Sequence, residues 1–168
     1  NRNELSLRTD RGVLKAHRKG ELVSVNMGHP LLNWADIPLS QPVDTLKLPL
    51  DGAPTATGMG NPHCTFFVAD AEAENLESIG PEIENNSLFP EGTNVQIAHV
   101  VSKDRIRTRV WERGVGPTLA SGSSSCATAV AAVRLGLTGR SVIIELDGGL
   151  IYIEWLDDGV WMTGATMH

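Results

Sequence analysis

The sequence has no excess of basic residues and no long apolar run. Its 168 residues carry 14 Lys and Arg against 20 Asp and Glu, a formal net charge of −6. Proteins that bind nucleic acids or anionic membranes do so mainly through clustered basic side chains. No segment of the sequence approaches the roughly 18–20 consecutive apolar residues of a membrane-spanning helix. We therefore expect neither nucleic acid nor a membrane as a partner.

Cysteine is also scarce. Cys64 and Cys126 are the only two, too few for a framework of disulfides, and this favours a reducing compartment such as the cytoplasm. Metal-binding motifs are missing as well, because His63-Cys64 lacks the spacing of a ligand pair and no second cluster of His, Cys or Asp completes a site. The sequence therefore gives no reason to expect a metal.

What the sequence does contain is alternating polar and apolar residues over most of its length, the pattern of half-buried strands. The composition, 41% hydrophobic and 20% charged, is typical of one globular domain. Strands are predicted at residues 4–9, 13–18, 21–27, 43–50, 63–70, 94–101, 105–114, 141–149, 150–159 and 160–167. Turns are predicted at 10–12, 18–20, 102–104, 147–148 and 158–159, and a flexible loop at 50–60.

Two segments are predicted to be helical. Residues 71–85 are polar and acidic, which indicates a surface helix with a break at Gly80-Pro81. Residues 123–136 contain Arg134 as their only charge, and a helix that is apolar nearly all round must be buried. We therefore predict an α+β fold, with a mixed, mostly antiparallel sheet curled into a barrel-like layer around one buried central helix.

The start of the buried helix, SGSSS at residues 121–125, has two interpretations. Gly122 and Ser123 would let a carboxylate or phosphate approach the unpaired N–H groups of the first helical turn, where the helix dipole favours negative charge. Alternatively, Ser123 is only a helix cap, and serine is common in that role. For this short stretch alone, capping is the simpler interpretation.

Two nearby motifs carry groups that could act with such a receptor. In VWERGVGPT, Arg113 can hold a carboxylate with two hydrogen bonds, and Glu112 can accept or orient a proton. In GMGNPHCTFF, His63 follows the turn at Asn61-Pro62 and has the side chain best suited to proton transfer near neutral pH. Either pair could instead be structural, since charged pairs at strand ends are usually solvated and single histidines are usually structural.

Three motifs in this order, GNPHC, EGTNVQIAHV and WERGVGPTLASGS, resemble the diaminopimelate epimerase family. The resemblance covers nearly the whole chain. It implies a cofactor-independent isomerase that inverts an amino-acid α-carbon with two opposed bases. The reaction implied is the conversion of LL- to meso-diaminopimelate in lysine and peptidoglycan precursor synthesis, so the expected partner is a small-molecule amino-acid substrate.

The resemblance also implies roles for individual residues. Asn61 and Asn94 would contact the substrate, and His63 would support the catalytic base contributed by another domain. Glu112 would partner the catalytic thiol, while Arg113 would hold the distal carboxylate of the substrate. Gly122 and Ser123 would receive the α-carboxylate.

This chain departs from the family pattern in lacking the N-terminal domain and its Cys-Gly-Asn-Gly turn. The chain opens on NRNELSLRTDRG, already in strand-like alternation, so we expect it to be part of a longer protein. On this view residues 1–22 belong to the junction and residues 23–168 form the C-terminal domain. The missing N-terminal domain is then an expected partner, and a homodimer is a further expectation.

A second departure is Ser121, which stands where the resemblance implies the second catalytic cysteine. A thiol has a pKa of about 8.5, which a helix N-terminus lowers, whereas an aliphatic hydroxyl is far less acidic. Cys126 lies five residues further along the helix and is predicted to pack in the core. Ser121 therefore fits a natural branch with different chemistry, an inactive homologue that binds amino acids or carboxylates, or an engineered Cys-to-Ser change. A further alternative is a racemase or isomerase of the same family that acts on another substrate.

Overall fold

The alternating segments form one sheet of eleven strands in the part of the chain that the structure, a computed structural model, describes: residues 3–9 and 12–165. The strands are β1 (Glu4–Thr9), β2 (Gly12–Lys19), β3 (Leu22–Asn26), β4 (Thr55–Gly58), β5 (Pro62–Phe67), β6 (Asn94–Ser102), β7 (Arg105–Glu112), β8 (Gly116–Thr118), β9 (Ser141–Leu146), β10 (Gly149–Leu156) and β11 (Gly159–Ala165). Their order is β1-β2-β3-β11-β10-β9-β7-β6-β5-β4, with β8 paired to β7. The turn predicted at Asp10 and Arg11 and the last two residues of segment 160–167 lie outside the described residues.

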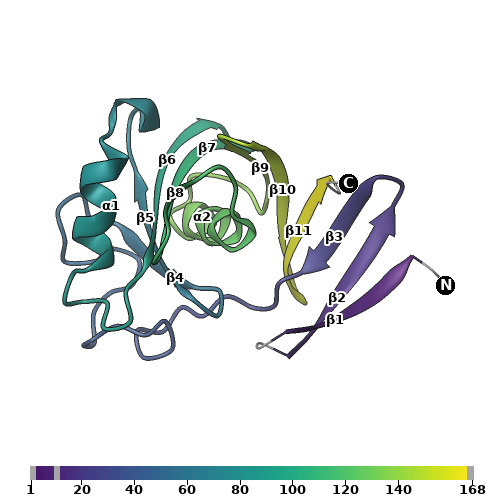
Figure 1. The fold of residues 1–168 in the computed structure, drawn as a ribbon, viewed down its shortest axis with the longest axis horizontal. Coiled ribbons are helices and arrows are strands. Elements are labelled where there is room, and N and C mark those ends of the chain that lie inside the picture. Colours follow the sequence, from purple (N-terminus) through teal and green to yellow (C-terminus); the bar gives the residue numbers. More distant parts are fainter. Residues whose placement is uncertain (1–2, 10–11, 166–168) are drawn as a thin grey trace.

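The sheet is mixed and mostly antiparallel, as predicted. Only β5 with β6 and β7 with β9 run parallel among the described strand pairs. The hinge predicted at residues 102–104 joins β6 to β7 as an antiparallel pair. These pairings place β4 to β11 around a common hollow (Figure 1).

The helix α2 (Gly122–Arg134) lies in that hollow and contacts β4 to β7 and β9 to β11 (Figure 1). Its nine residues from Ser124 to Ala132 are all buried. Small side chains such as Ala127 let the strands approach the helix closely, and larger side chains of the sheet, among them Ile144 and Ile153, fill the remaining space. The prediction of a buried central helix is confirmed.

The predicted barrel-like closure is not confirmed, because the sheet is open. Its two ends are β1 and β4, and the described strands do not join them. Strands β1 to β3 extend away from α2 and are attached to the rest through the pair of β3 with β11 (Figure 1). None of these three strands makes extensive contact with a helix in the described part of the chain.

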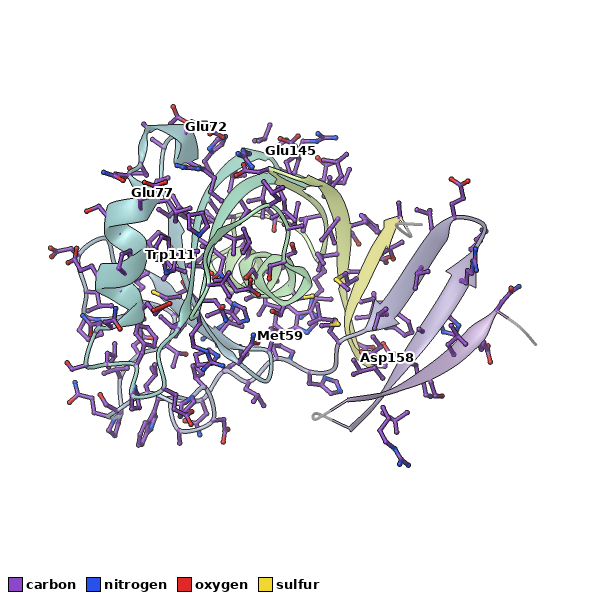
Figure 2. The ribbon with its side chains drawn as sticks, viewed as in Figure 1. Met59, Glu72, Glu77, Trp111, Glu145 and Asp158 are labelled. Atoms are coloured by element: carbon purple, nitrogen blue, oxygen red, sulfur yellow. The ribbon has the colours of Figure 1, made fainter. Side chains whose placement is uncertain are left out.

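The outer face of the sheet is covered by a 3-10 turn, η1 (Ala71–Ala73), and by the helix α1 (Leu76–Glu84). A surface helix is confirmed, but the break predicted at Gly80-Pro81 is wrong, since α1 runs through Pro81. The break falls instead before Leu76, where the side chain of Asn75 accepts a hydrogen bond from the N–H of Ser78 and caps the helix. Trp111 lies beside α1 (Figure 2), and its ring fills the space where Gly80 has no side chain.

Two further predictions are wrong between residues 43 and 60. Residues 43–50 form bends rather than a strand, and Pro49 within them has no N–H to donate to a ladder. Residues 50–60 are not a flexible loop throughout, because β4 lies within them and all four of its residues are buried. The hydrogen bond from Thr55 to the carbonyl of Leu46 ties the two segments together.

Neither described α-helix is long and apolar enough to cross a membrane. The predicted boundary between residues 22 and 23 remains a prediction.

Candidate functional site

The parallel pairing of β5 with β6 aligns four polar residues on the face that α2 covers. His63 pairs with Asn94, and Thr65 pairs with Gln96, two residues further along each strand. Side chains two residues apart on a strand share a face. All four are buried, so their polar atoms need partners inside the protein.

His63 has hydrogen-bond partners at both ring nitrogens. Its Nε2 lies 2.9 Å from Oδ1 of Asn61, and its Nδ1 lies 2.9 Å from Nε2 of Gln96. The prediction that His63 lies at the start of a buried strand is confirmed, since β5 begins at Pro62 and the ring is fully buried. Nδ2 of Asn61 is within 3.4 Å of the Ser123 hydroxyl, so the polar residues of β5 reach the start of α2.

The N-terminus of α2 is capped by Ser121, not by Ser123. Ser121 has extended backbone angles, and its Oγ accepts a hydrogen bond from the N–H of Ser124 at 3.3 Å. The N–H groups of Gly122 and Ser123 have no hydrogen-bond partner among the described residues. Unpaired N–H donors at the positive end of a helix favour negatively charged groups.

Gly122 packs closely against the side chain of Met162. A Cβ atom at this position would lie 2.5 Å from Sδ of Met162 on β11, far inside van der Waals contact. Ala120 and Gly122, the two neighbours of Ser121, both line a groove of about 470 Å³ whose other walls come from β3, β10, β11 and the β9–β10 hairpin. The start of α2 therefore borders a cavity.

Asn94 fixes the path of the chain around Arg113. Its Nδ2 donates to the carbonyl of Pro62, and its Oδ1 accepts from the N–H of Arg113 at 2.8 Å. The exposed Arg113 side chain donates to the carbonyl of Glu91 and forms no ion pair with any described residue. Its charge is consequently available for a carboxylate ligand.

The structure brings most of the predicted residues together, but not all. Asn61, His63 and Ser123 are linked by hydrogen bonds, and Asn94 holds Arg113 through its backbone. The half-buried Glu112 carboxylate has no hydrogen bond or ion pair with Ser121 or with any other described residue. Its predicted role beside residue 121 stays a prediction.

Both cysteines lie outside the site. Cys126 is fully buried among core residues of α2 and the sheet, as expected, and Cys64 faces the opposite side of β5 from His63, against Ile83 and Phe89. Burial raises the pKa of the Cys64 thiol well above its usual range. No group of three or more His, Cys, Asp or Glu residues in the described part of the chain could hold a metal ion.

Two residues of this network were missed by the sequence interpretation: Thr65 and Gln96. Gln96 donates to the Ser124 hydroxyl at 2.8 Å and accepts from Thr65 at 3.0 Å. A signal was present, because Gln96 interrupts the apolar run of β6 two residues after Asn94, and Thr65 follows His63 by two. Strand periodicity alone would have placed both beside the predicted residues.

Known proteins are similar to this chain in both sequence and fold. The family model for diaminopimelate epimerase matches residues 55–168. The chain belongs to this family. Diaminopimelate epimerase of Rhodospirillum centenum is 50% identical over 169 residues, covering 97% of this chain and 58% of the relative. That of Acidiphilium cryptum is 51% identical, covering 92% and 58%. The chain thus spans about three fifths of the length of these curated relatives.

Solved structures with low sequence identity to this chain have the same fold. A hydroxyproline epimerase from Agrobacterium vitis superposes with a TM-score of 0.65 and 12% identity, covering 98% of this chain and 57% of that one. A phenazine biosynthesis protein from Bacillus anthracis gives a TM-score of 0.60 and 12% identity, covering 96% and 64%. These similarities establish the fold and carry no information about the substrate.

Proposed function

We propose that this chain is the C-terminal half of a cofactor-independent epimerase that interconverts LL- and meso-diaminopimelate. The reaction would belong to lysine and peptidoglycan precursor synthesis in the cytoplasm. The observation that supports this most strongly is about 50% identity over almost the whole chain to proteins named diaminopimelate epimerase. The remaining two fifths of those relatives would correspond to the missing N-terminal domain.

Each end of the substrate has a receptor in this proposal. The free N–H groups of Gly122 and Ser123 bind the α-carboxylate, and Arg113 binds the distal carboxylate. Asn61 and Asn94 contact the substrate or hold the residues that do. His63 supports a base of the N-terminal domain, and Glu112 accepts or orients a proton at residue 121. The full protein could pair as a homodimer.

A two-base mechanism is difficult to reconcile with serine at position 121. Its hydroxyl has a far higher pKa than a thiol, so removal of an α-proton by its alkoxide is very unfavourable. The Ser121 oxygen is also engaged in capping α2. This observation favours a second candidate function, an inactive homologue that binds an amino acid or carboxylate without turnover.

One experiment separates the two functions. The protein at its full natural length is incubated with LL- or meso-diaminopimelate in D₂O, and α-deuterium incorporation is followed by NMR. The Ser121→Cys variant is compared with Ser87→Cys, which adds a thiol at an exposed turn. An epimerase exchanges the α-hydrogen, at least in the Ser121→Cys form.

The outcomes are distinct. Exchange by the natural serine protein would show that this branch works without a second thiol. Exchange only after Ser121→Cys would show that serine at position 121 is what prevents catalysis in a two-base site. Binding without exchange in every form would establish the carboxylate-binding module, and neither binding nor exchange would reject both functions.

A further inference from the structure

A buried glutamine lies behind the candidate site. The side chain of Gln96 is fully buried, and both its nitrogen and its oxygen have partners. Its Nε2 is 2.9 Å from Nδ1 of His63 and 2.8 Å from Oγ of Ser124, while its Oε1 accepts a hydrogen bond from Thr65 at 3.0 Å. Burial of an amide is costly unless it is fully hydrogen-bonded, and this one is.

These contacts determine where the His63 ring carries its proton. An amide nitrogen can only donate, so Nδ1 of His63 must be the acceptor toward Gln96. On the other side of the ring, Oδ1 of Asn61 can only accept, so Nε2 of His63 must be the donor. The two contacts agree on one neutral tautomer, with the proton on Nε2.

The donor and acceptor roles at His63 also fix the orientation of the Asn61 amide toward the start of α2. Because Oδ1 of Asn61 is used by His63, its amide N–H groups face the Ser123 hydroxyl at the start of α2. These N–H groups thus lie beside the unpaired N–H groups of Gly122 and Ser123. The opposite ring tautomer would turn the Asn61 amide over and present an oxygen there, where it would repel a carboxylate.

We propose that Gln96 is a positioning residue: it holds His63 in the Nε2–H tautomer and thereby turns the Asn61 amide so that the start of α2 presents only donors to a ligand. Gln96 acts through His63 and Asn61 without touching the ligand. The tautomer is inferred from the contacts of the two ring nitrogens with Asn61 and Gln96. Its benefit to carboxylate binding rests on the proposed function.

The test measures the ring directly. The full-length protein is labelled with ¹⁵N-histidine, and a long-range ¹H–¹⁵N correlation spectrum distinguishes protonated from bare ring nitrogens. His63→Gln identifies the His63 signals by their loss. The parent protein is expected to show a bare Nδ1 and a protonated Nε2. A proton on Nδ1 would overturn the proposal without any further variant.

Two isosteric variants extend the test. In Gln96→Glu the carboxylate can only accept, so Nδ1 is expected to become protonated. Gln41→Glu makes the same chemical change at an exposed position and is expected to leave the ring unchanged. The spectrum is recorded up to a pH at which the introduced carboxyl is ionised, and an unchanged His63 spectrum there in a folded Gln96→Glu protein would overturn the proposal. If Gln96→Glu does not fold, the parent spectrum still decides.

Ligand binding gives a separate measurement. If the tautomer orients Asn61 for a carboxylate, Gln96→Glu weakens diaminopimelate binding about fivefold or more, since one neutral hydrogen bond is worth about 1 kcal/mol. A tautomer switch with unchanged affinity would overturn the link to Asn61. A correct tautomer in a protein that neither binds nor exchanges diaminopimelate would refute the proposed function alone.

Discussion

A hydroxyl at position 121 changes both the chemistry and the stability of the helix start. Serine is among the best N-cap residues, and the Ser121 oxygen accepts the hydrogen bond from the Ser124 N–H that α2 would otherwise leave unmade. A thiol is a weaker acceptor but a far better acid. At this single position, then, capping and proton transfer favour different residues.

Replacing Ser121 is expected to cost stability even where it restores chemistry. Ser121→Ala should lower the free energy of unfolding by about 1 kcal/mol, equivalent to about 2–4 °C in melting temperature for a chain of this size. Ser121→Cys should lie between Ser121→Ala and the parent. Thermal unfolding followed by circular dichroism measures both. Ser87→Ala, at an exposed turn, serves as the control and should change little. Equal melting temperatures for Ser121→Ala and the parent would contradict the capping role.

The native cysteines are expected to be inert toward thiol reagents. Cys64 and Cys126 are both fully buried, and burial raises the pKa of the Cys64 thiol, so its reactive thiolate is scarce at neutral pH. Iodoacetamide should label neither cysteine in the native protein and both in denaturant, as measured by peptide mass. Ser121→Cys supplies a contrast, because its half-exposed position should be labelled under native conditions. Rapid native labelling of Cys64 would show that β5 is less tightly packed than the structure indicates.

At the scale of elements, α1 shows how a neighbour overrides local propensity. Glycine and proline in sequence predict a break, yet both lie inside α1 because Gly80 lets the Trp111 ring pack directly on the helix backbone. Trp111 also donates a hydrogen bond to Glu84 at the end of α1. Pro81 has no backbone N–H to donate, but its ring fixes φ near the value of an α-helix. Packing against β7 thus stabilises a helix that the sequence alone disfavours.

Gly80→Ala tests which effect is larger. Alanine improves helix propensity by about 1 kcal/mol, but its Cβ would lie 2.2 Å from the Trp111 ring. Overpacking of this kind costs about 1–3 kcal/mol or more, so we expect net destabilisation in urea unfolding. Gly139→Ala, outside the helices, is the control for an added methyl group without a clash, since no heavy atom lies within 4 Å of its Cβ position. A Gly80→Ala protein more stable than the parent would mean that propensity prevails.

At the scale of the whole molecule, the sheet has two regions of unequal support. Strands β4 to β11 surround α2, whereas β1 to β3 make extensive contact only with neighbouring strands in the described part of the chain. Apolar side chains on this extension are exposed, with Leu5, Val13 and Leu22 each at least 49% accessible. An extension with so much exposed apolar surface is expected to open more easily than the region around the helix.

Hydrogen exchange should reveal this difference. In the 168-residue chain, amides of β1 and β2 should exchange well before those of β6 and β7, as measured by mass spectrometry of peptides. If an N-terminal domain packs against the extension in the longer protein, the amides of β1 to β3 should gain protection there while those of β6 do not. Equal protection of β1 and β6 in the shorter chain would contradict the unequal support.

The sequence by itself determined the family, most of the strands, the buried helix and the candidate residues. Alternation with period two and a nearly uncharged stretch at 123–136 reflect burial directly, so they can be recognised without coordinates. Short motifs likewise located Asn61, His63, Asn94, Arg113 and the serine-rich turn. Each of these inferences depends only on neighbours in the chain.

Only the tertiary structure decided the relations between distant segments. The pairing of β5 with β6 brings His63, Gln96 and Ser124 into contact across 33 and 28 residues of sequence. The ring of Trp111 keeps α1 continuous, and Ser121 rather than Ser123 caps α2 because the backbone turns there. The sheet stays open because β1 to β3 lie away from α2 and do not pair with β4. Hydrogen bonds and packing act at a few ångströms, and proximity of that kind is fixed by the path of the whole chain.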